Sequence, residues 1–344
     1  MIIGYEGYVS GNQGIADRRR LLFWAEKKGH NVVSSQSEEA DLVVITSSSD
    51  LDYWAHKKMK VPLILDVVDG LIGEQSRVKD NLRGFGYWAT RRHNSLIPRK
   101  FSHSLLSVAE KSSIVICSSV EQVEEWAKFG IKAADILDFH EEIPSLKPRH
   151  GITPNSGGNL FWEGLPATLS SIKMLDHVFT NSPNKVFNLN IATNLESFRY
   201  MNRFIRYDLK QMINNHLDLR NIHLQISQWN PENLVKLVNE SNIGVIPISS
   251  NSGYNHLKAE NRLLIMWRLG LPVLTSPLSS YVRVMKDAEI PGICRDKYEW
   301  AQKVRLLNES ATLQQEFHEK AQEYLSRRHR VEDVLEKWDS ALSF

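Results

Sequence analysis

The segment that decides the fold is residues 243–277, IGVIPISSNSGYNHLKAENRLLIMWRLGLPVLTSP. It reads as an apolar strand, a polar loop, a helical pattern, a tight turn at Gly270 and a second apolar strand. Strands that are apolar on both faces and separated by helices indicate a parallel sheet covered on both sides. The polar loop then lies at the carboxyl end of a strand and leads into a helix N-terminus, where backbone N–H groups and the helix dipole favour an anion.

The same alternation extends along the chain in both directions. We predict strands at 1–5, 31–34, 41–46, 62–69, 113–117 and 133–137, and again at 159–162, 186–192, 222–226, 243–248 and 272–275. Residues 140–158 separate the two series and hold three prolines and three glycines, which is typical of a linker. The sequence therefore predicts an α/β fold with two doubly wound, Rossmann-like domains in tandem.

The predicted domain boundaries follow from this pattern. We place the first domain at 1–145, the second at 146–328 and a C-terminal helix at 329–344. Other continuous helices are predicted at 17–28, 168–179 and 200–217. The C-terminal helix carries one apolar stripe, which predicts packing in a core. Its members are Val331, Val334, Leu335, Trp338 and Leu342.

The composition is that of a globular protein in a reducing compartment. Its 42 basic and 40 acidic residues give a net charge of +2, which argues against a nucleic-acid partner. Cys117 reads as a core thiol, and neither it nor Cys294 has the spacing of a zinc ligand. The first residues read as a strand rather than a signal peptide, and no apolar run reaches the ~20 residues of a membrane span, so we expect a cytoplasmic protein.

The decisive segment carries side chains suited to a phosphorylated ligand. Lys258 and Arg262 offer cationic donors to phosphate oxygens, and Glu260 and Asn261 can hydrogen-bond sugar hydroxyls. The alternative is a solvated helix start without a ligand. Asp50-Leu51-Asp52 has the spacing of a metal-binding D-x-D motif, but we interpret Asp50 as a helix N-cap.

One motif of the decisive segment resembles that of a known family. It reads Lys258-x-x-Asn261-Arg262-Leu263-Leu264, followed by Leu269-Gly270-Leu271-Pro272-Val273. This is similar to the donor-site motif of GT-B glycosyltransferases in the "glycosyl transferases group 1" (family 4-like) superfamily. Further resemblance lies in Trp162-Glu163-Gly164, in Gln228-Trp229 and in the strand at 62–69.

The resemblance implies two domains that face a central cleft, with the C-terminal helix crossing back to the first domain. It implies transfer of a sugar from a nucleotide-diphospho-sugar to a saccharide or lipid-linked acceptor, in surface polysaccharide or glycan biosynthesis, without a metal or other cofactor. The implied donor-binding residues are Lys258, Arg262, Glu260, Asn261, Tyr254, Ser250, Trp229, Gln228, Thr193 and Gly164.

The acceptor side is implied at the first domain. The acceptor would lie against Gly11, Asn12 and Gly14, with Asp69 as the catalytic base. The alternatives are a plain strand-to-helix turn at 11–14 and a cap at Asp69. Asp66, three residues earlier, is predicted to be structural.

Three features of that family are missing from this sequence. The Arg/Lys pair that many members of the family carry after the first strand of the donor domain is not evident near residues 163–170. The family's pair of acids eight residues apart would fall at Leu257 and Ile265, and its histidine after the fourth strand would fall near Val68 or Asp69. Whether the reaction inverts or retains therefore stays open. The alternative function is a catalytically inactive GT-B-like protein that binds a saccharide or a nucleotide.

Residues 83–101 are rich in basic and aromatic side chains. Cations next to interfacial aromatics can rest on anionic lipid, so a peripheral contact with the inner membrane surface is one hypothesis for this segment. The alternative is a surface loop next to a helix.

Overall fold

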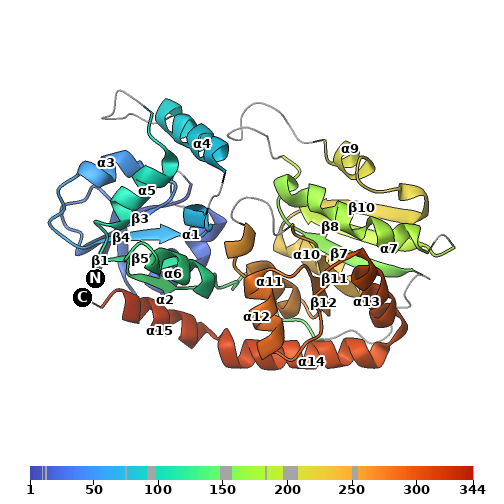
Figure 1. Ribbon diagram of the computed structural model, residues 1–344. Helices are drawn as coiled ribbons and strands as arrows, with labels where there is room; N and C mark the ends of the chain where they lie inside the picture. The colour runs from blue at the N-terminus through green and yellow to red at the C-terminus, as the bar shows by residue number, and fades with distance from the viewer. Residues whose placement is uncertain are drawn as a thin grey trace. The chain divides into compact units, whose positions relative to one another are not determined.

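The computed structural model describes residues 1–9, 11, 14–73, 76–90, 98–147, 157–182, 184–196, 208–249 and 255–343 (Figure 1). The chain divides into two compact units, of which the first combines Met1–His140, Asn251–Ala259 and His329–Phe344. The second consists of Glu141–Ser250 and Glu260–Arg328. Each unit is built around its own parallel sheet, so the predicted α/β class with two Rossmann-like sheets is confirmed.

The first unit contains a six-stranded sheet with the strand order β2-β1-β3-β4-β5-β6. Its strands are β1 Ile2–Glu6, β2 Asn31–Ser34, β3 Leu42–Thr46, β4 Leu63–Val67, β5 Ile114–Cys117 and β6 Ala133–Asp135. Gly4 of β1 is paired with Val33 on one side and Val43 on the other. The topology therefore reverses between β1 and β3, and open sheets of this kind bind ligands beyond the carboxyl ends of such strands.

Helices cover both faces of this sheet. They are α1 Ile15–Arg19, α2 Leu21–Lys27, α3 Leu51–His56, α4 Arg77–Thr90, α5 Phe101–Ala109, α6 Val120–Ala127 and α15 Val331–Ala341, with the 3-10 turns η1 Leu71–Gly73 and η4 Asn255–Leu257. The predicted N-cap of α3 is confirmed, because the Asp50 side chain accepts a hydrogen bond from Tyr53 N at 3.0 Å.

Two apolar layers fill the space between these helices and the sheet, because alternate strand residues point to opposite faces. Ile3 and Val44 pack on one face with side chains of α2 and α15. Val43 and Leu65 pack on the other face with side chains of α3, α5 and α6. Cys117 lies in this second layer, and burial raises its pKa to about 12, as expected for a core thiol.

The last helix of the chain, α15, belongs to the first unit and lies beside α2 (Figure 1). Trp338 stacks on Trp24 of α2 with ring centroids 5.9 Å apart, and Trp24 Nε1 donates to Asp339 at 2.8 Å. Val334 and Leu342 are buried in the same layer. The predicted core stripe of the C-terminal helix is thus confirmed.

The second unit contains a five-stranded parallel sheet with the order β10-β8-β7-β11-β12. Its strands are β7 Gly158–Glu163, β8 Phe187–Thr193, β10 Ile222–Gln228, β11 Ile243–Ile246 and β12 Val273–Thr275. Its helices are η2 Pro166–Leu175, α7 Asp176–Thr180, α9 Leu209–Asn214, η3 Leu219–Asn221, α10 Pro231–Asn239, α11 Asn261–Arg268, α12 Ser279–Asp287, α13 Lys297–Glu309 and α14 Ala311–Arg328. All five strands predicted for this half are present.

The continuous helix predicted at 17–28 is wrong. The structure divides it into α1 and α2 at Arg20, whose backbone leaves the helical region with φ −120° and ψ −109°. The guanidinium of Arg20 is buried and bonds to Asp66, which follows it by 46 residues. A long-range ion pair thus accompanies the break in the local helical pattern. Here tertiary contacts outweigh the helix propensity of the local sequence.

The helix predicted at 168–179 is also wrong in type. It is a 3-10 helix, η2, up to Leu175, and it becomes α-helical only afterwards. The hydroxyls of Thr168 and Ser171 donate to backbone carbonyls three residues earlier, at 2.9 and 2.8 Å, and such bonds compete with the α-helical pattern. Of the helix predicted at 200–217, the described residues form only α9 and the turn after it.

Candidate functional site

Four predicted donor residues meet at the carboxyl end of the second sheet. Gly164 follows β7, Thr193 ends β8, and Gln228 ends β10 directly before Trp229. Thr193 Oγ1 donates to the Gly164 carbonyl at 2.7 Å, and Trp229 N donates to the Thr193 carbonyl at 2.8 Å. The side-chain carbonyl of Gln228 accepts from Leu195 N at 2.9 Å. Neighbouring strands therefore bring these residues to the edge at which open α/β sheets bind ligands.

Arg262 joins this group through Glu163, a buried carboxylate that is absent from the predicted site. Arg262 Nε lies 3.3 Å from one carboxylate oxygen of Glu163, and another guanidinium nitrogen donates to the Glu163 carbonyl. Trp229 Nε1 donates to the second carboxylate oxygen at 3.0 Å. One acid thus orients an arginine and a tryptophan. The signal in the sequence is an acid at the end of an otherwise apolar strand, where an unpaired charge would be costly.

Gly164 provides the conformation and the space for this arrangement. Its φ is +155°, which favours glycine. A Cβ at this position would lie 3.2 Å from the guanidinium carbon of Arg262 and 3.1 Å from the Trp162 ring. The same guanidinium lies over that ring, 5.1 Å from its centroid. Arg262 is therefore a fixed cation, and a planar, oriented guanidinium is well suited to phosphate oxygens.

Glu260 and Asn261 stand at the start of α11. Glu260 is buried and pairs with Arg283, whose nitrogen lies 3.2 and 3.3 Å from its two carboxylate oxygens. The Glu260 side chain does not cap the helix. Asn261 Oδ1 is buried and has no hydrogen-bond partner among the described residues. The first turn of α11 thus combines a structural ion pair with an amide oxygen that the described protein leaves unused.

Lys258 and Asp69 both belong to the first unit. Asp69 follows β4 and reaches solvent, but the surrounding protein atoms displace part of its hydration. This partial loss of hydration raises the pKa of Asp69, and the positive charges of Lys258 and Arg83 oppose that rise without cancelling it. The structure thus brings the predicted base under the electrostatic influence of the predicted phosphate-binding lysine.

On the acceptor side, the structure gives the two described glycines backbone roles. Gly11 has φ +85°, and a Cβ there would meet nothing within 4 Å. Gly14 N donates to Asp17 at 2.9 Å, and a Cβ on Gly14 would lie 2.6 Å from the same oxygen. The close approach at Gly14 therefore serves the buried carboxylate of Asp17. The predicted residues Asn12, Ser250 and Tyr254 lie outside the described residues.

A buried ionic network lies in the same unit as Asp69, and it includes the predicted structural residue Asp66. Arg20 lies 2.6 Å from Asp66 and 3.2 Å from Asp138, and it donates to Ser118 Oγ at 3.1 Å. Burial alone would lower the pKa of Arg20, but the two carboxylates outweigh it and raise that pKa, so the guanidinium stays charged. The structural interpretation of Asp66 is confirmed, since its side chain is fully buried.

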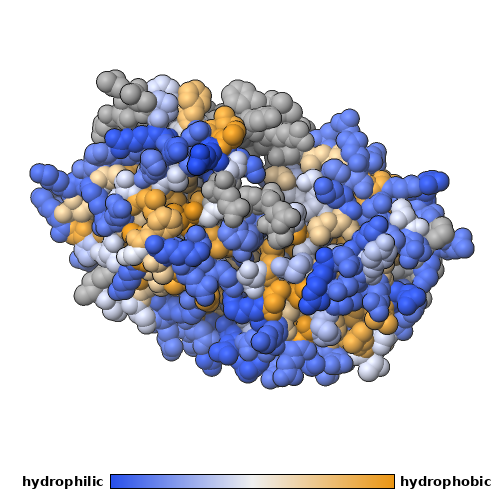
Figure 2. Space-filling view, viewed as in Figure 1, coloured by the Kyte–Doolittle hydropathy of each residue, from blue (hydrophilic) through white to orange (hydrophobic). Residues whose placement is uncertain are grey.

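The α4 helix presents an apolar stripe to solvent. Val78, Leu82 and Phe85 are 68%, 65% and 54% exposed and follow one another by four and three residues, so they share one face. Figure 2 shows apolar surface in this region beside strongly hydrophilic side chains. Residues 91–97 of the predicted basic and aromatic segment lie outside the described residues. No helix in the described part of the chain combines the length and the hydropathy that a membrane span requires.

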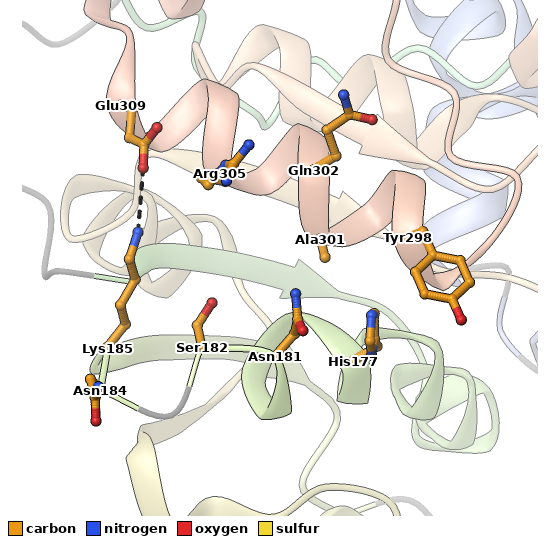
Figure 3. A pocket seen from close by; sticks show the side chains of 10 residues that line it. All are labelled: His177, Asn181, Ser182, Asn184, Lys185, Tyr298, Ala301, Gln302, Arg305 and Glu309. Atoms are coloured by element: carbon orange, nitrogen blue, oxygen red, sulfur yellow. Dashed lines mark hydrogen bonds and ion pairs between the residues drawn. The ribbon is translucent and has the colours of Figure 1, made fainter.

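A groove of about 480 Å³ lies between α7 and α13, and Figure 3 shows its side chains facing one another. Lys185 pairs with Glu309 across it at 3.3 Å, and Arg305 and Tyr298 line the same space. None of the predicted site residues lines this groove. It runs between two helices rather than at the carboxyl ends of strands, so we do not place the site there. Among the described residues, no group of three or more His, Cys, Asp and Glu side chains could hold a metal ion.

No protein-family model matches the sequence, and no curated protein matches it either. Solved structures do match. HepE of Anabaena, in complex with UDP, is 12% identical with a TM-score of 0.62 over 99% of both chains. WaaG, a glycosyltransferase involved in lipopolysaccharide biosynthesis, is 12% identical with a TM-score of 0.58 over 100% of both chains.

A third match is a mutant of TarM from S. aureus, in complex with fondaparinux, α-GlcNAc-glycerol and UDP. It is 12% identical with a TM-score of 0.60 over 88% of this chain, which spans about 55% of the length of TarM. At these identities the likeness establishes the fold alone. The chain has the GT-B fold, which confirms the fold that the donor-site motif indicated.

Proposed function

We propose that this chain is a glycosyltransferase that moves a sugar from a nucleotide-diphospho-sugar to a saccharide or lipid-linked acceptor, in surface polysaccharide or glycan biosynthesis. One observation carries the proposal: Gly164, Thr193, Trp229 and Arg262 gather at the carboxyl end of the second sheet in a chain with the GT-B fold. The HepE and TarM structures are complexes with UDP, which supports a nucleoside diphosphate as the leaving group.

Departure of the diphosphate is the first chemical demand. Negative charge builds on the phosphates as the bond to the sugar breaks, and fixed positive groups stabilise that charge. Arg262, held by Glu163, and Lys258 supply the cations, and the N-terminus of α11 adds backbone N–H groups. Because protein groups can meet this demand, we propose a reaction that uses no metal ion and no other cofactor.

Activation of the acceptor is the second demand. We assign it to Asp69, with the acceptor beside Gly11 and Gly14. The acceptor hydroxyl gives its proton to the carboxylate while its oxygen forms the new bond to the anomeric carbon and the diphosphate leaves. The pKa of Asp69 is raised toward neutral pH, and a general base works best when its pKa lies near the pH at which the enzyme operates.

A thermal-shift screen against UDP-, GDP-, dTDP- and CMP-sugars tests the proposal. A ligand that binds only the folded protein raises its apparent stability by mass action. One of the three diphosphate donors, the UDP-, GDP- or dTDP-sugars, should raise the melting temperature, and its sugar should then be consumed in the presence of a saccharide acceptor. A shift with CMP-sugars alone, which carry a single phosphate, or no shift with any of the four would contradict the proposal.

The alternative is a catalytically inactive protein that binds a saccharide or nucleotide on the same scaffold. One observation favours it: the positions of the missing acid pair are held by Leu257 and Ile265, and both side chains are buried. Turnover separates the two functions. Binding without consumption of any donor would establish the alternative.

For localisation we propose a cytoplasmic protein that touches the inner membrane surface through residues 83–101, together with the exposed apolar stripe of α4 that adjoins them. An amphipathic helix with apolar and basic side chains rests on anionic lipid, and a lipid-linked acceptor would lie in that surface. Leu82→Glu should reduce flotation with phosphatidylglycerol vesicles. Val282→Glu changes an equally apolar side chain that is 40% exposed on α12, and it should have no effect. Equal flotation of Leu82→Glu and the unmodified protein would refute the contact.

A further inference from the structure

The η4 segment, which we define as residues 255–258, packs against the rest of the first unit through Leu257. The buried Leu257 side chain lies over two glycines. A Cβ at Gly70 would lie 2.4 Å from Leu257 Cβ, and a Cβ at Gly73 would lie 2.4 Å from Leu257 Cδ1. Carbon atoms without a bond between them do not approach so closely, so Gly70 is required for space against Leu257 Cβ, whereas a methyl at Gly73 would only turn the tip of the leucine side chain away. Leu257 also holds the first position of the missing acid pair, where it serves as an apolar anchor.

Gln122 of α6 holds the backbone of the same segment. Its Nε2 donates to the Leu257 carbonyl at 2.9 Å and to the Val68 carbonyl at 3.1 Å, while its Oε1 accepts from Ser118 N at 3.1 Å. Ser119 Oγ adds a longer bond to the Leu257 carbonyl, at 3.3 Å. Gln122 is 1% exposed, and both polar atoms of its amide are used, so its orientation is fixed.

The two carbonyls that Gln122 joins belong to neighbours of the charged groups in the proposed site. Val68 precedes Asp69, and Leu257 precedes Lys258. Among the charges that act on Asp69, Lys258 acts most strongly, followed by Arg83 of α4 and by Asp138. A single buried amide therefore links the two stretches of backbone that carry the predicted base and the predicted phosphate-binding lysine.

We propose that Gln122 is a positioning residue that holds Lys258 beside Asp69. It acts through the carbonyls of Val68 and Leu257 and does not itself contact the substrate. The inference rests on the proposed function, in which Lys258 faces the diphosphate and Asp69 takes the proton. It adds a residue on a helix of the first unit that neither the donor motif nor the fold would have indicated.

Hydrogen–deuterium exchange of the full-length protein tests this role without turnover. Gln122→Ala should speed exchange of the amides of the η4 segment by about tenfold, because local opening loses a buried restraint. Gln322→Ala is the matched control, since Gln322 Nε2 also donates to a backbone carbonyl, that of Trp267, at 2.8 Å. Unchanged exchange in the η4 segment of Gln122→Ala would overturn the proposal.

A second variant keeps the test decisive if Gln122→Ala does not fold. Gln122→Met keeps the length of the side chain but has no donor for the Leu257 and Val68 carbonyls. It should speed exchange of the same amides, because the restraint on the η4 segment is lost. Normal protection of the η4 segment in a folded Gln122→Met protein would overturn the proposal.

The pH dependence of turnover separates positioning from general stability. Lys258 lowers the pKa of Asp69, so its release in Gln122→Ala raises that pKa further. In a plot of kcat against pH, the acid limb should therefore move to higher pH in Gln122→Ala and stay in place in Gln322→Ala. A limb that does not move would overturn the positioning role. If the unmodified protein consumes no donor, the proposed function fails, whereas exchange still decides whether Gln122 holds the η4 segment.

Discussion

Glu163 and Glu260 are buried carboxylates that each hold an arginine, Arg262 in one case and Arg283 in the other. Removing charges from water costs free energy, so such pairs contribute orientation more than stability. Arg262 is held on three sides, by the carboxylate of Glu163, by the backbone carbonyl of Glu163 and by the Trp162 ring. The site therefore begins as a rigid cation at the end of a strand.

Glu163→Gln should destabilise the protein, because Arg262 loses the charge that balances it. We expect a loss of about 1.5–3 kcal/mol in the free energy of unfolding, the range of a hydrogen bond to a charged group. Urea denaturation measures it. The control is Glu309→Gln, which weakens an ion pair whose carboxylate is largely exposed and should cost less than about 1 kcal/mol. Equal losses in both variants would show that Glu163 has no special role.

Asp69→Asn should abolish turnover and raise the melting temperature at pH 7. A carboxyl whose pKa is raised on folding disfavours the folded state once it ionises, so its cost is present above the unfolded pKa of about 3.9 and vanishes below it. The gain in melting temperature should thus shrink as the pH falls toward 4. A variant that is less stable than the unmodified protein at pH 7 would contradict this prediction.

At the scale of elements, the sequence predicts structure that depends on neighbouring residues and misses structure that depends on contacts between residues far apart in the chain. Short apolar runs between helical patterns, clearest in β3 and β4, placed all five strands of the second sheet and all six of the first. The break between α1 and α2 could not be predicted, because it coincides with an ion pair between Arg20 and a residue 46 positions later. The 3-10 geometry of η2 likewise involves hydrogen bonds from the Thr168 and Ser171 hydroxyls to the backbone, and the spacing of apolar residues does not reveal them.

Arg20→Met tests the network behind that break. Asp66 would be left buried without its cation, and breaking a buried pair on one side costs about 3–5 kcal/mol of unfolding free energy. Arg295→Met removes an exposed arginine that pairs with Glu299 at 3.4 Å, and it should cost no more than about 1 kcal/mol. Urea denaturation of both variants supplies the comparison. A loss below about 1 kcal/mol in Arg20→Met would contradict the structural role of the pair.

At the scale of the whole molecule, the chain returns to its first unit twice. Residues 251–259 and 329–344 belong to that unit, so the predicted donor residues divide, with Lys258 in the first unit and Glu260, Asn261 and Arg262 in the second. The motif indicates these residues as donor-binding candidates because it is local in the sequence. Glu163 carried only the signal of an acid at the end of an apolar strand, because its partner Arg262 lies 99 residues away. Gln122 carried no such signal, since its role rests on a contact 135 residues away.

Isothermal titration calorimetry with UDP, GDP and dTDP tests the central claim, that a nucleoside diphosphate binds at Lys258 and Arg262. One of the three should bind, and Lys258→Ala and Arg262→Ala should each weaken it at least about tenfold, as expected for the loss of one charge-assisted contact. Arg305→Ala, in the groove between α7 and α13, should leave the affinity unchanged. Unaltered affinity in both site variants, with loss in Arg305→Ala, would contradict the account and move the ligand to that groove.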